Sequence, residues 1–143
     1  MLRIVLDSTV LVSAFLTAGG AADAVIQRAR DGLVLVYASE EILDETRKVL
    51  AYPRLVERHR YAEQEVQAFY ARVRDAVLPV SPLPPLPAIC RDPHDDMVLA
   101  CAVAAAVQYL VTRDKDLLVL HQYEGIAMIT PEAFLAALRT APH

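Results

Sequence analysis

Apolar runs that alternate with stretches of helical spacing limit this chain to a small group of folds. The runs are residues 2–6, 33–38, 109–112 and 126–130. Apart from Arg3 and the threonines that end the last two runs, they are apolar, which is typical of strands that are buried on both faces of a parallel sheet. We therefore predict an α/β fold with three layers, α/β/α, around a central parallel sheet of four or five strands. We expect a strand order near 3-2-1-4-5.

The segments between these runs have the spacing and end signals of helices. We predict helices over residues 8–17, 22–30, 40–51, 62–77, 93–108, 114–120 and 131–138. The segment LPVSPLPPLP (78–87) is extended, because proline excludes a helix there. A chain of 143 residues fits one domain, so we interpret this segment as a connection within a domain that spans residues 1–143.

The composition bounds the location and the partners of the protein. Hydrophobic residues make up 55%, yet no apolar run reaches the length of a membrane span and no cationic leader is present. The spacing of Cys90 and Cys101 does not suggest a metal pair, and reduced thiols suit a cytoplasmic protein. The net charge of −4 disfavours a dedicated nucleic-acid binder, although acids that bind cations would account for part of it.

Two aspartates follow predicted strands directly. Asp7 comes after residues 2–6, and Asp114 comes shortly after residues 109–112. In open parallel sheets, ligands bind outside the carboxyl ends of the strands. The alternative is that each aspartate only caps the helix that follows it. The coincidence of two acids at one sheet edge favours a site.

Glu45 lies on an apolar stripe of its predicted helix. Ile42, Glu45 and Val49 share one face, whereas Glu41 is assigned to a separate polar face. An acid on an apolar face is costly unless it is paired or binds a metal ion. The alternative is a glutamate at the margin of the stripe that reaches solvent.

The segment RDPHDDMVLACA offers three further acids. Asp92 with Pro93 is a normal helix start, and Asp95 can reach back as in a capping box. Asp96 has no capping task and shares a face with Leu99, Ala100, Val103 and Val107. We assign Asp96 to function and keep Asp95 as its competitor.

Four acids thus converge in the predicted sheet, namely Asp7, Glu45, Asp96 and Asp114. Carboxylate oxygens suit Mg²⁺ or Mn²⁺. Such ions activate water for phosphodiester cleavage. The pattern therefore indicates a metal-dependent phosphodiesterase site.

Five segments, taken together, resemble the PIN domain family. They are VLDSTVLVSA, ASEEILDETRKVL, RDPHDDMVLACA, LVTRDKDLL and TPEAFL. The resemblance matches the family's acid positions to the four acids above and adds Asp116 as a supporting acid and metal ligand. It implies a Mg²⁺- or Mn²⁺-dependent ribonuclease, and it is strongest to bacterial toxin components of toxin–antitoxin systems, related to VapC.

The chain departs from the family pattern after the first aspartate, where Ser8-Thr9 replaces the usual Thr-Asn. Ser8 keeps a hydroxyl that can hold a carboxylate or water, and Thr112 is a second candidate for support. Thr9 lacks the amide, which leaves its supporting role open.

The resemblance also implies partners, which are an RNA substrate, an antitoxin protein and a second copy of the chain. Candidate phosphate ligands are Arg91, Arg113 and Lys115, which lie beside the acidic segments. His94 and His121 show no ligand spacing, and we assign them no role. The candidate dimer face, on the helix over residues 62–77, consists of Val66, Phe69, Tyr70 and Val73, and its alternative role is packing on the sheet.

Three other functions compete with this interpretation. A receiver-like module also holds Mg²⁺ in an acidic pocket, but it needs paired acids after the first strand and an acid after a middle strand. This chain has one acid after its first strand and none on the strand LVLVYA. A phosphatase with a D-x-D motif needs a second acid two residues after the first, where this chain has Thr9 after Asp7. A PIN-fold scaffold that acts mainly through protein binding is the third, and the intact acids disfavour it.

Overall fold

The computed structural model describes residues 1–86 and 88–140. Its strands are β1 (Arg3–Leu6), β2 (Leu35–Ala38), β3 (Val77–Pro79), β4 (Tyr109–Val111), β5 (Gln122–Tyr123) and β6 (Ile126–Ile129). They form one sheet in the order β3-β2-β1-β4-β6-β5, in which only the pair of β5 and β6 is antiparallel. The predicted parallel sheet is confirmed. The predicted order 3-2-1-4-5 agrees with β3-β2-β1-β4-β6 only when β3, which the sequence did not predict, is counted as the third strand.

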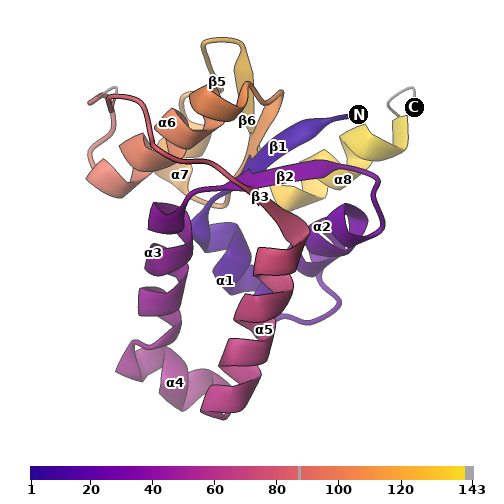
Figure 1. Ribbon diagram of the computed structural model, residues 1–143, viewed down its shortest axis with the longest axis vertical. Coiled ribbons are helices and arrows are strands. Elements are labelled where there is room, and N and C mark those ends of the chain that lie inside the picture. Colours follow the sequence, from indigo (N-terminus) through magenta and orange to yellow (C-terminus); the bar gives the residue numbers. More distant parts are fainter. Residues whose placement is uncertain (87, 141–143) are drawn as a thin grey trace.

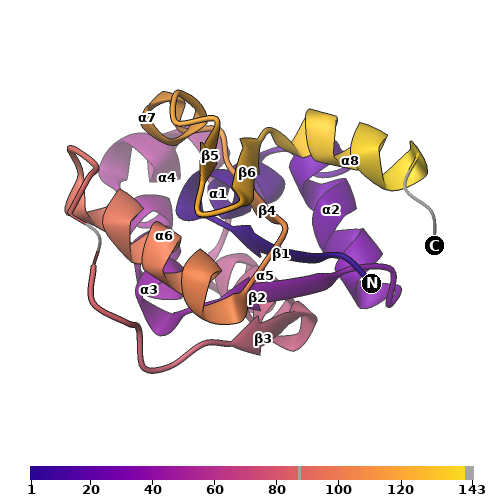
Figure 2. The ribbon, with the colours of Figure 1, turned by 90° about the horizontal axis from the view of Figure 1, so that it is seen from above.

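The helices that cover this sheet come from all parts of the chain. They are α1 (Ser8–Leu16), α2 (Ala21–Arg30), α3 (Glu40–Leu50), α4 (Pro53–His59), α5 (Glu63–Ala76), α6 (Pro93–Ala105), α7 (Lys115–Leu118) and α8 (Pro131–Thr140). α1, α2 and α5 lie below the sheet in Figure 1, and α6 lies above it against β1, β2 and β4. Figure 2 shows the same arrangement from above, with α6 and α2 on different sides of β1. The predicted α/β/α layering is confirmed.

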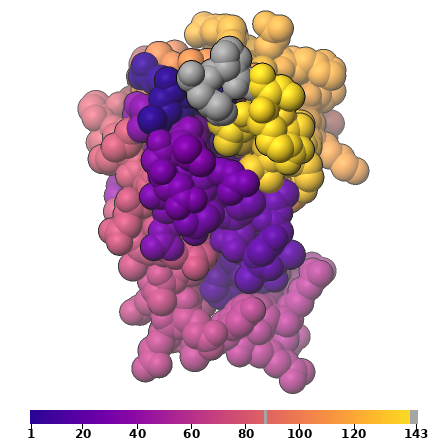
Figure 3. All heavy atoms as spheres, turned by 90° about the vertical axis from the view of Figure 1, so that its right-hand side faces the viewer, coloured from indigo at the N-terminus to yellow at the C-terminus, as the bar shows by residue number. Residues whose placement is uncertain are grey.

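The core lies on both sides of the central strands. Ile4, Val5 and Leu110 are fully buried, as their continuous apolar strands predict. On the outer side, α2 and α8 are in contact, and Figure 3 shows α2 in purple beside α8 in yellow, with the magenta α4 region below them. The central strands therefore contribute side chains to two apolar layers.

Three short elements were not predicted from the sequence. The edge strand β3 ends with Pro79, which an edge tolerates because a central strand would need its missing N–H. α4 begins at Pro53, a favoured first position of a helix. β5 has only two residues and pairs with β6 through a turn at Gly125, whose φ is +82°. Elements this short carry little periodicity.

The apolar face on α5 packs into the protein's own fold. Phe69 and Val73 are buried, and the ring of Phe69 lies 5.0 Å from that of Phe15 of α1, centroid to centroid. Val66 and Tyr70 are partly buried against the same core. The candidate dimer face is therefore corrected, because its central residues are not accessible to a second copy.

The helices α1 and α2 meet at a sharp bend. No single helix in the described residues is long and apolar enough to cross a membrane, and only this pair passes jointly by length and composition, with a bend of 101° between them. Both helices bury apolar residues in the core, including Val10 and Val25.

Candidate active site

Asp7 follows β1 and is held by three hydrogen bonds. Its carboxylate accepts from the hydroxyls of Thr9 and Thr112, both at 2.6 Å, and from the backbone N–H of Val10 at 3.2 Å. Thr112 is in reach because β1 and β4 are in parallel register at their last residues. Asp7 is 2% exposed. Asp7 therefore caps α1 and at the same time lies in the pocket as a fixed carboxylate, so capping and a place in the site do not exclude each other.

The hydroxyls around Asp7 are themselves fixed by the backbone of the loop after β4. The Thr9 hydroxyl accepts from the N–H of Arg113 at 3.0 Å, and the Thr112 hydroxyl accepts from the N–H of Asp114 at 2.9 Å. Thr9, whose role the sequence left open, therefore orients Asp7 by donating to it. Ser8 lines the same pocket, but its hydroxyl makes no hydrogen bond within the described residues.

Asp95 and Asp96 have exchanged the roles that the sequence suggested. Asp96 accepts from the backbone N–H groups of Ile89 and Cys90, at 3.1 and 3.0 Å, and so fastens the loop before α6. Asp95 lies in the pocket with Asp7 and Asp114 and caps nothing. The placement of Asp96 in the site is corrected: the geometry favours Asp95.

The reason for the exchange is the shape of the buried face of α6. Both aspartates are almost inaccessible, at 6% and 5% exposed for Asp95 and Asp96. The stripe that continues from Asp95 is buried through Val98, Leu99 and Ala102. The stripe from Asp96 reaches Val103, which is 37% exposed. This spacing was readable in the sequence, but α6 is apolar nearly all round and both stripes seemed equally buried.

Asp114 and Asp116 complete the cluster around α7. One carboxylate oxygen from each of Asp95, Asp114 and Asp116 lies within 4.8 Å of the others. Asp114 also caps α7, because it accepts from the N–H of Asp116 at 2.9 Å. As at Asp7, a cap of a short helix is at the same time a member of the acidic group.

Glu45 reaches the pocket from α3 and is 19% exposed. The Nε2 atom of His94 lies 3.3 Å from its Oε2 atom, and the Nδ1 atom of His94 lies 3.1 Å from Oδ1 of Asp92. His94, to which the sequence gave no role, therefore joins two acids at the rim. Glu41, which the sequence placed on a separate polar face, also lines the pocket.

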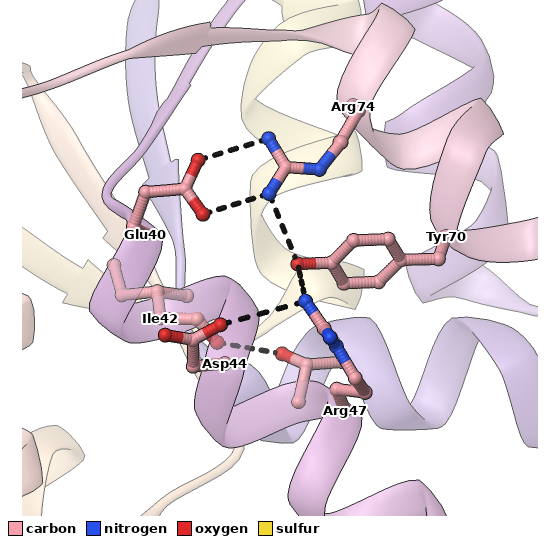
Figure 4. Close-up of polar contacts among 7 residues, drawn as sticks. Glu40, Ile42, Asp44, Arg47, Tyr70 and Arg74 are labelled. Carbon is pink, nitrogen blue, oxygen red and sulfur yellow. Dashed lines mark hydrogen bonds and ion pairs between the residues drawn. The ribbon is translucent and has the colours of Figure 1, made fainter. Parts of the chain in front are cut away.

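Exposed polar side chains of α3 also contact α5, as Figure 4 shows. Arg74 donates to both carboxylate oxygens of Glu40, at 2.9 and 2.7 Å. The hydroxyl of Tyr70 accepts from Arg47 at 3.1 Å and from Arg74 at 3.3 Å. We call these four residues the arginine–tyrosine cluster. It joins α5 to α3, the helix that carries Glu41 and Glu45.

The pocket holds negative charge that no neighbouring cation compensates. Burial raises the pKa of Asp7 to about 6, although its hydrogen bonds with Thr112 and Thr9 lower it. Burial, followed by the charge of Asp114, raises the pKa of Asp95 well above its usual range. No Lys or Arg is among the described residues that line the pocket. The site thus favours either protons or a bound cation.

The comparison with protein families decides the assignment. A family model described as "PIN domain" matches residues 3–116. The chain belongs to the PIN domain family. The match includes all of the acids described above, from Asp7 to Asp116.

A solved structure also shares the fold of this chain. The crystal structure of PAE2754 from Pyrobaculum aerophilum superposes with a TM-score of 0.67 at 17% identity, over 98% of this chain and 91% of that chain. At this identity the likeness shows the fold. Among curated protein sequences, none matches this chain.

PIN domains are generally nucleases that use divalent metal ions, and the residues of this pocket fit such an ion. The Oδ2 atom of Asp95 is buried and has no hydrogen-bond partner within the described residues. A buried carboxylate oxygen without a donor is costly unless a cation supplies the missing interaction. The nearby oxygens of Asp114 and Asp116 provide the hard ligands that Mg²⁺ and Mn²⁺ prefer.

The basic residues predicted to bind phosphate lie outside this pocket. Arg113 pairs with both carboxylate oxygens of Glu132, at 3.0 and 2.8 Å, and donates to Ser13 at 3.1 Å. Arg91 and Lys115 are exposed and do not line the pocket. Arg113 therefore braces α1 against α8, while the other two remain candidates for phosphate contacts near the rim.

Proposed function

We propose that this PIN domain is an endoribonuclease that depends on Mg²⁺ or Mn²⁺ and is the toxin of a toxin–antitoxin pair. The observation that carries the nuclease proposal is the buried, unpartnered oxygen of Asp95 beside Asp114 and Asp116. A purely structural acid would be expected to find a donor, as Asp96 does in the same turn of α6.

The five carboxylates of the site divide into three metal ligands, one carboxylate fixed by hydrogen bonds and one base at the rim. Asp95, Asp114 and Asp116 have oxygens close enough to share one cation. Asp7 is fixed by two hydroxyls, so its carboxylate is aimed before any substrate arrives. When bound, a divalent cation would lower the pKa of water and stabilise the charge that develops on the phosphodiester. Glu45, joined to His94 at the rim, is placed to accept a proton from water.

Single-stranded or looped RNA is the substrate class that we favour. The acids lie in a pocket of the surface between α3, α6 and α7, and flexible strands can enter such a pocket where a stiff duplex cannot. The overall charge of −4 is then a property of the metal-free chain, because each divalent ion adds two positive charges in the site.

A cleavage assay tests the nuclease proposal. Labelled single-stranded RNA, hairpin RNA and single-stranded DNA are incubated with the protein in Mg²⁺, in Mn²⁺ and in EDTA. We expect internal cleavage of the RNAs that EDTA stops and that Asp7→Asn abolishes. Cleavage that persists in EDTA, or equally in the Asp7→Asn protein, would assign it to a contaminant and refute the proposal.

The toxin role has its own test. We expect induction of the wild-type chain in a bacterial host to arrest growth, and induction of Asp7→Asn at equal protein level to leave growth normal. Co-purification of a small partner that blocks cleavage would support an antitoxin. A host that grows normally while it accumulates active nuclease would separate the enzyme from the toxin role.

A further inference from the structure

A second hollow lies next to the acidic pocket, between α1 and α4. It is lined from α1 by Thr9, Val12, Ser13, Leu16 and Thr17, and from the other side by Arg58, His59 and Tyr61. Thr9 lines both hollows, so the second one begins where the acidic pocket ends. Figure 1 shows α4 joining the lower ends of α3 and α5, below α1. We call this hollow the α1–α4 groove.

One wall of the groove is a line of hydroxyl groups. Thr9, Ser13 and Thr17 are spaced by four residues and therefore share one face of α1 and its last turn. The line is about 12 Å long at the rise of an α-helix. The Ser13 hydroxyl accepts from Arg113, which leaves its own hydrogen free to donate toward the groove. Ser13 and Thr17 can therefore donate to oxygen atoms of an extended ligand, whereas the Thr9 hydroxyl donates to Asp7.

The opposite wall supplies a cation and an aromatic surface. Arg58 is exposed and makes no ion pair within the described residues, unlike Arg113 on the other side of α1. Tyr61 is 39% exposed, and its ring stacks on His59 with centroids 5.4 Å apart and an angle of 19°.

The aromatic surface is also rigid. The edge of Phe15 supports Tyr61 from α1 at 4.9 Å. The ring of His59 is held by the carbonyl of Leu50 at 3.3 Å and by the N–H of Tyr61 at 3.0 Å. A free guanidinium and a supported aromatic ring, in a groove of hydroxyls, match a sugar–phosphate strand with its bases.

We propose that the α1–α4 groove binds the single-stranded RNA that flanks the scissile phosphate. Arg58 binds a phosphate, Tyr61 stacks on a base, and the hydroxyls of Ser13 and Thr17 donate to phosphate or ribose oxygens. The groove supplies the positive charge that the acidic pocket lacks, and the shared residue Thr9 makes the path continuous. This inference rests on the proposed ribonuclease function and adds the direction in which the substrate leaves the site.

Binding measured without cleavage tests the groove. Fluorescein-labelled decamers of oligoadenylate and oligouridylate are titrated with the full chain in EDTA, and anisotropy is read across a salt series. Arg58→Ala should weaken both complexes and reduce the slope of log affinity against log salt by about 0.7, the loss of one phosphate contact. Tyr61→Leu should weaken oligoadenylate binding about tenfold, with an unchanged slope.

Matched controls separate the groove from general charge and from misfolding. Arg54→Ala removes the same charge from α4 outside the groove and should keep the wild-type slope. Tyr61→Phe keeps the ring and should bind like the wild type, while Tyr61→Leu keeps apolar packing against Phe15. Equal slope losses in the two arginine variants, or unchanged binding in Tyr61→Leu, would overturn the proposal.

Two further outcomes are distinguishable. If no condition gives RNA cleavage but the Arg58 and Tyr61 effects on binding hold, the groove stands and the nuclease proposal fails. If Tyr61→Leu dissociates a dimer seen by light scattering and leaves oligonucleotide binding unchanged, the groove is a protein contact and the RNA proposal is overturned.

Discussion

The acidic pocket and the arginine–tyrosine cluster contain the same kinds of acid in opposite electrostatic settings. In the cluster, Glu40 faces Arg74, and that ion pair lowers the pKa of Glu40. In the pocket, Asp95 faces Asp114, and burial together with that neighbour raises the pKa of Asp95. Both regions include residues of α3. On this helix, the charge of Glu40 is balanced by an arginine, whereas the acids in the pocket have no lysine or arginine beside them in the part of the chain that the structure describes.

The difference shows where folding and function make different demands. The arginine–tyrosine cluster is exposed, and its ion pairs contribute little because water screens them. Asp7 and Asp95 in the pocket are buried, so solvent screens their repulsion with Asp114 less. An arrangement that opposes folding is expected at a site that gains its stability from a bound ion.

The largest effect should come from exchanging one aspartate of the pair on α6. We expect Asp95→Asn to reduce RNA cleavage by at least about a hundredfold, because it removes a charged ligand from the centre of the cluster. Asp96→Asn keeps the oxygen that accepts from Ile89 and Cys90 and should retain most of the activity. The measurement is the initial cleavage rate of both variants at saturating Mn²⁺. Loss of cleavage in Asp96→Asn with retained cleavage in Asp95→Asn would assign the site to Asp96.

The next effect concerns pH in the metal-free state. The pKa of Asp7 rises from 3.8 to about 6 on folding, so the folded state binds the extra proton between these values. Its contribution to stability therefore falls as pH rises from about 4 to 6, by about 3 kcal/mol for a shift of this size.

Urea unfolding in EDTA at several pH values measures this contribution. The difference in unfolding free energy between wild type and Asp7→Asn should grow through that window in favour of the variant. Asp75→Asn, at an exposed position, should follow the wild-type profile. A constant difference between wild type and Asp7→Asn would show that the pKa of Asp7 is the same in the folded and the unfolded protein.

A metal ion should stabilise the pocket by a similar but slightly smaller amount. Mn²⁺ at about one hundred times its dissociation constant should add about 2.7 kcal/mol to the wild type through mass action. Asp114→Asn should remove most of this gain, although asparagine still caps α7 through the bond to Asp116. Thermal melts with EDTA and with Mn²⁺ provide the measurement. Equal shifts in wild type and variant would exclude Asp114 from the metal site.

The smallest effect should come from the arginine–tyrosine cluster. Arg74→Met removes both bonds to Glu40 and one to Tyr70, yet these groups are exposed. We expect a small loss of melting temperature that disappears at high salt, because salt screens surface pairs. A double-mutant cycle with Glu40→Gln isolates the coupling. A large loss that salt does not change would mean that the cluster stabilises the fold as strongly as the core.

Much of the fold and part of the site could be read from the chain. The apolar strands and the main helices followed from periodicity, because a buried parallel strand and an amphipathic helix leave distinct patterns. Asp7 and Asp114 followed from their positions after β1 and β4, and Glu45 followed from its apolar stripe. β3, α4 and β5 did not follow, because two to seven residues carry too little periodicity to outweigh local turn signals.

The chain's own pattern therefore predicted the α/β architecture, which is confirmed, and pointed to Asp7, Glu45 and Asp114, which the structure brings to one pocket. Only the tertiary structure favours Asp95 over Asp96, because both are buried on a mostly apolar helix and only their neighbours differ. It also decided the support of Asp7 by Thr9 and Thr112, since the register of β1 and β4 brings together residues about a hundred positions apart. Periodicity reports which face of an element is buried, whereas partners across the sheet exist only once the strands have paired.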